Sequence, residues 1–323
     1  MNAGRTASCV YGPVPSRRLG CSLGLDLIPY KTCSYDCVYC QLGRTTELTT
    51  IRRPFLDVGR ALDELAQRLQ VIDRPDVVTL AGSGEPTLNE GMGDLIRGIR
   101  RLTDVPVAVI TNGSLLTDPA VRADLILADL VVPSLDAGDE ATFRLVNRPH
   151  ADIRFAPMVD SLVEFSARFA GKLWLEALLV AGLSDSDEQV RRLAELTARV
   201  NPGRVQLTTI CRPPADPSVS AVPEERLREL ARLFPGTVDV VAAPSTDPSI
   251  LEGSGGATGD DVMALLARRP CTPEDVARGL GLPAVEALKI LEALRATDQA
   301  CVRPMNGRTY YEPTKPARED PSA

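Results

Sequence analysis

Apolar positions along residues 1–243 follow two alternating periods, one typical of strands and one typical of helices. Short runs rich in Val, Ile and Leu are separated by stretches in which apolar residues recur every three or four positions. Such repetition predicts an α/β fold with a parallel sheet and right-handed crossovers, and about six units predict a partial (β/α)6 barrel. The expected strands are Ser22–Ile28, Val77–Ala81, Val107–Thr111, Leu130–Ser134, Lys172–Val180, Arg204–Thr209 and Val238–Val241, and the expected helices are Asp57–Gln70, Gly91–Leu102, Pro119–Ala128, Ala156–Ala170, Ser186–Val200 and Pro223–Leu233.

A change of composition marks the end of the barrel. Residues 244–259 are rich in Pro, Ser, Gly and Thr, which is typical of a linker. A small domain is expected over residues 260–314, followed by a tail over residues 315–323. Asn306-Gly307 is a strong signal for a two-residue hairpin turn, so three helices and a hairpin predict a winged-helix-like domain. Its expected elements are helices over Asp260–Arg268, Thr272–Gly279 and Pro283–Arg295 and strands over Cys301–Pro304 and Arg308–Glu312.

The charge of the chain limits its partners. A formal net charge of −7 argues against a broadly basic nucleic-acid-binding surface. Residues 258–323 hold nine Lys or Arg against ten Asp or Glu, so autonomous DNA binding by this region is not expected. Protein contact, substrate docking or a barrel lid is preferred for it. No apolar stretch is long enough to span a bilayer, and the first residues lack a secretory core, so we expect a cytoplasmic location without membrane contact.

Three cysteines lie within eight residues, at Cys33, Cys37 and Cys40. In a reducing compartment this spacing suits one metal cluster better than disulfides. Three thiolates can bind three irons of a cubane [4Fe–4S] cluster and leave the fourth iron open to a substrate or cofactor. Zinc is the alternative, but zinc normally has four ligands and would have to recruit a distant cysteine or His150, the only histidine of the chain.

A glycine-rich turn over Gly82–Pro86 follows the second expected strand. Glycines let a backbone approach a ligand closely, and the carboxylate of Glu85 can accept hydrogen bonds from an ammonium group. Polar side chains also follow the next two strands, at Asn112 and at Ser134 and Asp136, where parallel α/β folds bind their ligands. Taken alone, each of these segments is more typical of a turn or a helix cap than of a ligand site.

The C-x3-C-x2-C spacing, with Tyr39 before the last cysteine and the turn Gly82–Pro86 further on, resembles the radical S-adenosylmethionine (SAM) superfamily. In that family SAM chelates the open iron, and a reduced cluster cleaves SAM to methionine and a 5′-deoxyadenosyl radical that abstracts hydrogen. The resemblance implies an enzyme with a [4Fe–4S] cluster and SAM as cofactors and a reducing partner such as flavodoxin or ferredoxin. It implies iron ligands at Cys33, Cys37 and Cys40 and cofactor contacts at Gly82, Ser83, Gly84, Glu85, Pro86, Asn112, Ser134 and Glu176.

Longer runs over Tyr11–Gly20, Gln41–Thr46 and Val146–His150 resemble the branch related to tRNA wyosine-base synthases. That branch implies an anionic substrate such as a nucleotide or tRNA. Its true members bind a second cluster through three upstream cysteines and hold pyruvate as a Schiff base on a lysine. Only Cys9 and Cys21 lie upstream here, so the substrate stays unassigned.

Further residues bear on the reaction. Lys31 and Lys172 are the only lysines of the barrel, and Cys211, after the sixth strand, is a candidate hydrogen-atom donor or third ligand of a second cluster. Arginines that converged on one mouth of the barrel would favour an anionic substrate. The candidates are Arg17, Arg18, Arg44, Arg52, Arg53, Arg148 and Arg212. The alternative functions are wyosine-type modification of tRNA or another nucleotide, and an iron–sulfur regulator that binds DNA through the winged helix.

Overall fold

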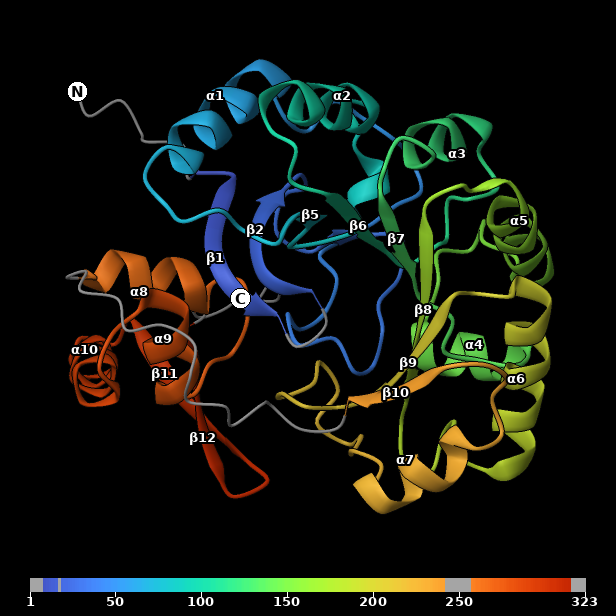
Figure 1. Cartoon of the computed structure of the whole chain (residues 1–323). Coiled ribbons are helices and arrows are strands. Elements are labelled where there is room, and N and C mark those ends of the chain that lie inside the picture. The colour runs from blue at the N-terminus through green and yellow to red at the C-terminus, as the bar shows by residue number, and fades with distance from the viewer. Residues whose placement is uncertain (1–7, 17–18, 242–256, 315–323) are drawn as a thin grey trace, which may run out of the picture. The chain divides into compact units, whose positions relative to one another are not determined.

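The computed structural model describes residues 8–16, 19–241 and 257–314. These residues form two compact units, one ending at Val241 and one beginning at Ala257 (Figure 1). The expected linker lies outside the described residues except for residues 257–259, and the expected tail over residues 315–323 lies wholly outside them. No helix of the described residues has both the length and the apolar character needed to cross a membrane.

One curved eight-stranded sheet forms the first unit, in the order β1-β2-β5-β6-β7-β8-β9-β10 (Figure 1). All neighbouring strands from β2 to β10 pair in parallel, which confirms the predicted α/β partial barrel. The strands are β1 (Val10–Ser16), β2 (Gly20–Asp26), β5 (Val77–Ala81), β6 (Val107–Thr111), β7 (Leu130–Pro133), β8 (Lys172–Leu179), β9 (Arg204–Thr209) and β10 (Val238–Val241).

The edge strand β1 was not predicted. It pairs antiparallel with β2, and its register shifts between Tyr11 and Val14. Its sequence contains Gly12, Pro13 and Pro15, residues that argue against a strand. Proline has no backbone N–H to donate. An edge strand with an irregular register tolerates this, because it pairs on one side only and not every N–H takes part in the pairing.

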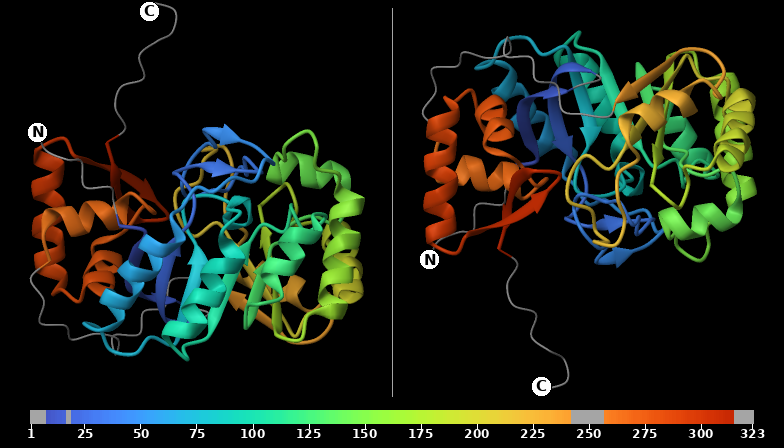
Figure 2. Two further views of the ribbon diagram at one scale, coloured as in Figure 1. Left: turned by 90° about the horizontal axis from the view of Figure 1, so that it is seen from above. Right: turned by 90° about the horizontal axis from the view of Figure 1, so that it is seen from below.

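Helices cover the outer face of the sheet (Figure 2). They are α1 (Val58–Leu69), α2 (Met92–Leu102), α3 (Pro119–Leu125), α5 (Phe155–Arg168), α6 (Asp187–Val200) and α7 (Glu224–Ala231). Each lies close to its predicted range. A further helix, α4 (Glu140–Asn147), was missed, although Asp139 caps it and Phe143 and Val146 bury one face of it.

The inner face of the sheet is apolar at the N-terminal ends of its strands and polar at the C-terminal ends. Side chains alternate along a strand, so Ser134 follows Val132 on the same face, and Glu176 follows Trp174. By the same alternation Asn112 shares the inner face. The apolar layer beneath them consists of Val77, Ala108, Ile110, Leu130, Val132 and Trp174. The candidate cofactor residues thus gather inside one end of the barrel.

The second unit contains three helices and a hairpin, where the sequence predicts them. They are α8 (Gly259–Leu266), α9 (Pro273–Leu280), α10 (Ala284–Ala296), β11 (Ala300–Met305) and β12 (Arg308–Pro313). Capping boxes start α8 and α9, and Cys271 lies buried in the unit's small core. The winged-helix interpretation of this unit stays a prediction.

Candidate functional site

The cysteine loop connects β2 to α1 and lies at the C-terminal ends of the strands (Figure 2). Its two short strands, β3 (Thr32–Cys33) and β4 (Glu47–Leu48), pair with each other. The backbone N–H of Val38 donates to the carbonyl of Val146 at 2.9 Å, and the N–H of Asp216 donates to the carbonyl of Val38 at 2.9 Å. The end of α4 and the segment after β9 therefore fix the middle of the loop.

Each of the three loop thiols receives an N–H donor from a different part of the chain. The pairs are Asn112 Nδ2 with Cys33 Sγ at 3.7 Å, Asn147 Nδ2 with Cys37 Sγ at 3.6 Å, and Lys31 Nζ with Cys40 Sγ at 3.2 Å. Hydrogen bonds from N–H groups stabilise thiolates, and bonds to cluster-bound sulfurs set cluster potentials. This donor set fits three thiolate ligands of a [4Fe–4S] cluster.

Burial keeps the free thiols of Cys33 and Cys37 neutral. It raises the pKa of Cys33 to about 12 and that of Cys37 well above its ordinary value, and the neighbouring loop thiols add to both shifts. A bound metal reverses this, because a coordinating thiol is deprotonated. In a cubane cluster each cysteine binds a different iron, so the three cysteine Sγ atoms need not converge on a single metal position. Among the described residues no three His, Cys, Asp or Glu side chains converge on a single-ion site.

The glycines of the turn Gly82–Pro86 allow close contacts with the rest of the site. Gly82 has φ +134°, and a Cβ there would lie 2.3 Å from Asp26 Oδ1. A Cβ at Gly84 would lie 1.9 Å from the carbonyl oxygen of Thr32 in the cysteine loop. Ser83 donates through its hydroxyl to Asp26 Oδ2 at 2.5 Å. Both glycines are thus required by contacts within the protein, and their approach to a ligand stays a prediction.

Glu85 is buried at the end of β5, with 2% exposure, and its two oxygens differ. Oε1 accepts from Thr87 N, Thr87 Oγ1 and Thr111 Oγ1 at 3.1, 2.6 and 2.6 Å. Among the described residues, Oε2 accepts only from Asn112 N, at 2.7 Å. Burial raises the pKa of Glu85, and the hydrogen bonds oppose that shift. A carboxylate oxygen accepts about two bonds, so Oε2 retains capacity for an ammonium donor.

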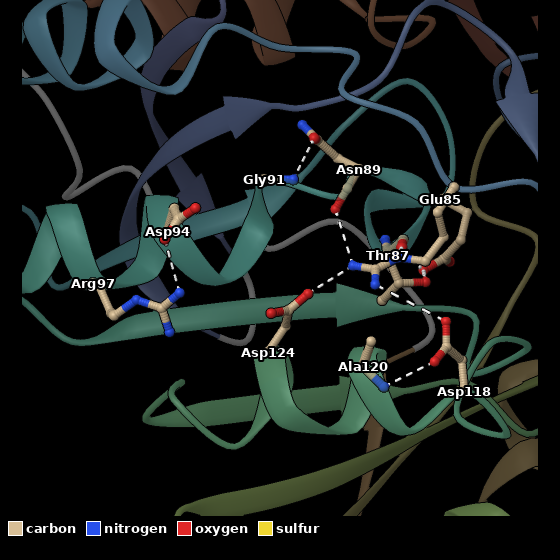
Figure 3. Close-up of polar contacts among 10 residues, drawn as sticks. Glu85, Thr87, Asn89, Gly91, Asp94, Arg97, Asp118, Ala120 and Asp124 are labelled. Atoms are coloured by element: carbon tan, nitrogen blue, oxygen red, sulfur yellow. Dashed lines mark hydrogen bonds and ion pairs between the residues drawn. The ribbon is translucent and has the colours of Figure 1, made fainter.

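Arg52 supports this turn through hydrogen bonds, and Figure 3 shows its partners Thr87, Asn89 and Asp124 near Glu85. Its guanidinium donates to the carbonyls of Thr87 and Asn89 at 2.9 and 3.3 Å and to Asp124 Oδ2 at 2.6 Å. These carbonyls belong to the 3-10 turn η1 (Pro86–Leu88) and its end. Sequence reasoning grouped Arg52 with possible substrate ligands. The structure assigns it to holding the turn that carries Glu85.

A second buried carboxylate, Asp136, follows β7. It accepts from Tyr39 Oη at 2.5 Å, from Asn147 Nδ2 at 2.7 Å and from the N–H of Leu178 at 2.9 Å. Burial raises its pKa to about 6, and the nearby charge of Glu176 adds to the shift. Asp136 thus links the cysteine loop, α4 and β8. Asn147, which the sequence reasoning did not select, also contacts Cys37 Sγ.

Other sequence candidates lie apart from the loop. Cys9 packs near the end of β2 beside Glu64, whereas Cys21 lies near its start beside Asp76. Cys9 lies beside Asp26, five residues along β2 from Cys21. Five residues of strand span about 16 Å, so the two cysteines are too far apart to bind one cluster. Cys211 follows β9 and donates to the carbonyl of Thr209. The second cluster considered from the sequence therefore has no support in this geometry.

Most of the candidate arginines are paired with carboxylates rather than gathered at one mouth. The pairs are Arg44 with Asp36 at 2.7 Å, Arg52 with Asp124 at 2.6 Å, Arg53 with Glu47 at 2.7 Å and Arg148 with Asp216 at 2.8 Å. Arg148 still has a buried Nη1 without a partner among the described residues. Arg17 and Arg18 lie outside the described residues. Arg148 therefore keeps one donor nitrogen that no described residue uses.

Comparison with known proteins gives a family. The Radical SAM superfamily matches residues 27–197, just over half of the chain. A UPF0026 protein from Helicobacter pylori is 33% identical over 308 residues, which are 94% of this chain and 96% of that protein. A protein named GTPase Obg from Brachyspira hyodysenteriae is 37% identical over 303 residues. The match covers 94% of this chain but only 45% of that protein, less than half of its length.

A solved structure gives the same fold. TYW1 with a lysine–pyruvate adduct bound is 17% identical, with a TM-score of 0.50 over 66% of this chain and 72% of that one. At that identity the likeness concerns the fold alone. The superfamily match includes the three loop cysteines, Gly82–Pro86 and the polar strand ends up to Glu176. The chain therefore belongs to the radical SAM superfamily of enzymes and, within it, to the UPF0026 proteins.

Proposed function

We propose that this chain cleaves SAM at a [4Fe–4S] cluster bound by Cys33, Cys37 and Cys40 and uses the resulting radical to remove hydrogen from a substrate. The observation that carries the proposal is the set of three loop thiols, each with its own N–H donor. Membership of the superfamily implies both cofactors. When bound, the reduced cluster would supply the electron that splits SAM into methionine and a 5′-deoxyadenosyl radical. A flavodoxin or ferredoxin would supply that electron.

The polar inner edge of the barrel would hold SAM. Glu85 Oε2 would accept the ammonium of its methionine part, since this oxygen has one protein donor and room for another. Asn112 and Ser134, on the same inner face, would bond the ribose hydroxyls. Glu176 would lie beside Ser134, with which it pairs, and near enough to Asp136 for their charges to interact. The apolar layer below and the cysteine loop above would exclude water from the reacting atoms.

The test is anaerobic reconstitution of the whole chain with iron and sulfide. The wild type should bind about four irons, and with dithionite and SAM it should release 5′-deoxyadenosine. Alanine at Cys33, Cys37 or Cys40 should abolish both. Alanine at Cys21, which lies at the other end of β2, is the matched control and should retain the cluster. One zinc per chain without iron–sulfur absorbance would refute the proposal.

Wyosine-type chemistry on a nucleotide or tRNA is the second candidate. The fold is similar to that of TYW1, which was solved with a lysine–pyruvate adduct. Of the two barrel lysines, Lys172 is exposed at the start of β8, and only Lys31 lies at the cysteine loop. The partnerless Nη1 of Arg148 would suit a phosphate or carboxylate. Trapping of pyruvate with cyanoborohydride, followed by peptide mass spectrometry, would identify a lysine adduct if one forms.

For the second unit we propose docking of a substrate or protein partner. Its winged-helix-like region, residues 260–314, presents on α10 both Glu286 and Lys289 together with exposed Val285 and Leu288. Mixed charge with apolar contact area suits a protein surface better than phosphates. DNA-dependent regulation therefore ranks below docking.

A further inference from the structure

The side chain of Lys31 lies against one of the three loop cysteines. Its Nζ is 3.2 Å from Cys40 Sγ, and the residue is only 3% exposed. Among the described residues, Cys40 is the one side chain to which this ammonium donates a hydrogen bond. A buried ammonium is costly without a compensating negative charge. Its partner in the assembled site is therefore a thiolate.

The backbone around Lys31 fixes the position of this ammonium. Its φ of 60° is in the left-handed region, which a residue with a Cβ adopts only under constraint. Its N–H donates to the carbonyl of Ser83 at 2.7 Å, and its own carbonyl accepts from the N–H groups of Thr46 and Glu47 at 3.0 and 3.2 Å. Lys31 is thus held between the Gly82–Pro86 turn and the strand β4.

Lys31 brings a charged donor to the loop sulfurs through its contact with Cys40. The side-chain amides of Asn112 and Asn147, the hydroxyl of Tyr39 and the backbone of Tyr35 also donate to loop sulfurs, and all four groups are uncharged. Among the described donors to these sulfurs, Lys31 is therefore the one cation.

We propose that Lys31 is a positioning residue that acts through Cys40 to stabilise the reduced cluster and so makes its reduction easier. The inference rests on the proposed function, because it requires a cluster on the three cysteines. Reduction adds one electron and one negative charge, which a fixed neighbouring cation stabilises. A compact ammonium suits this position better than a guanidinium, because its charge is concentrated next to one sulfur.

The experiment is a redox titration of the reconstituted full chain, followed by electron paramagnetic resonance of the reduced cluster. Lys31→Met removes the charge and the donors, whereas Lys31→Gln keeps N–H donors without the charge. Both should shift the midpoint potential to more negative values, with the larger shift for Met, at unchanged iron and sulfide content. Lys172→Met is the control. It removes an exposed lysine at the start of β8, the end of the strand away from the cysteine loop, and should leave the midpoint potential unchanged.

The possible outcomes separate the two proposals. A wild-type chain without a cluster refutes the proposed function itself. A wild-type cluster whose potential is unchanged in Lys31→Met overturns only the role of Lys31. Failure of both Lys31 variants to load iron would assign the residue to cluster assembly and would also overturn it. A reduced pyruvate adduct on Lys31 would contradict the inference in favour of a Schiff base.

Discussion

Replacing Glu85 by glutamine tests the candidate SAM site most sharply, because the change keeps the shape of the side chain and removes its charge. Each carboxylate oxygen faces a backbone N–H that cannot turn away, Thr87 N at Oε1 and Asn112 N at Oε2. In either orientation the glutamine NH2 must therefore face one N–H. An unsatisfied buried donor costs about 1–3 kcal/mol.

Removing the buried charge of Glu85 has the opposite effect on stability. Since burial raises the pKa of Glu85, the folded state disfavours its ionised form, and the neutral amide avoids that penalty. We therefore expect a net loss near the lower limit, about 1 kcal/mol, which lowers the melting temperature of a domain of this size by about 2–4 °C. The chain should still fold and load its cluster.

SAM binding should suffer more than folding. A hydrogen bond between an ammonium and a carboxylate contributes about 1.5–3 kcal/mol, which corresponds to a rise in Kd of about 10- to 150-fold. Anaerobic equilibrium dialysis of labelled SAM against cluster-loaded protein measures this directly. Thr87→Val is the matched control, because it removes a hydroxyl donor from Oε1 and leaves the charge and Oε2 intact.

The control should change SAM affinity by less than about threefold, since no charged contact is lost. Two results would contradict the assignment of Glu85. One is an unchanged Kd in Glu85→Gln at full iron content. The other is an equal loss of affinity in Thr87→Val, which would mean that the turn matters only for its shape.

Three further predictions concern other parts of the chain. In cluster-free protein the folded chain holds the proton of Asp136 more tightly than the unfolded chain, since its pKa is raised to about 6, so stability present at low pH is lost as pH rises through this value. Urea unfolding should show a decrease of up to about 3 kcal/mol between about pH 4 and pH 7 that Asp136→Asn lacks. Arg52→Met should cost about 3 kcal/mol, because it leaves Asp124 and two carbonyls without their donor, whereas the exposed Arg97→Met should cost less than about 0.5 kcal/mol. The full chain should bind random duplex DNA with a Kd no tighter than about 10⁻⁴ M, and tight, salt-sensitive binding that disappears when residues 258–323 are removed would favour the regulator instead.

Much of the fold follows from local sequence because its strands and helices have clear periods. The parallel strands from Val77–Ala81 to Arg204–Thr209 occur as expected, and turn residues mark their ends. Among the elements longer than three residues, β1 and α4 were missed. Prolines obscure the first, and the second is a short helix whose cap, Asp139, is a single residue.

The site could be predicted only where a motif is continuous in sequence. Cys33, Cys37 and Cys40 are recognisable because one loop supplies all three, and Glu85 because glycines surround it. The contacts that require the glycines are with Asp26 and Thr32, segments that the turn meets only after folding, so the sequence alone could not reveal them. A glycine in the sequence shows that no side chain is present at that position, but not which neighbouring group packs there in the folded chain.

The donors to the cluster sulfurs show the limit of sequence reasoning. Asn112 is 79 residues from Cys33, and Asn147 is 110 residues from Cys37, so no local pattern connects them. Each reaches its sulfur because parallel strands place their following segments at the same end of the sheet. The cysteines can therefore be identified from spacing, whereas the groups that set their electrostatic environment follow from topology. Relatives with the same three cysteines can differ in cluster potential through those donors alone.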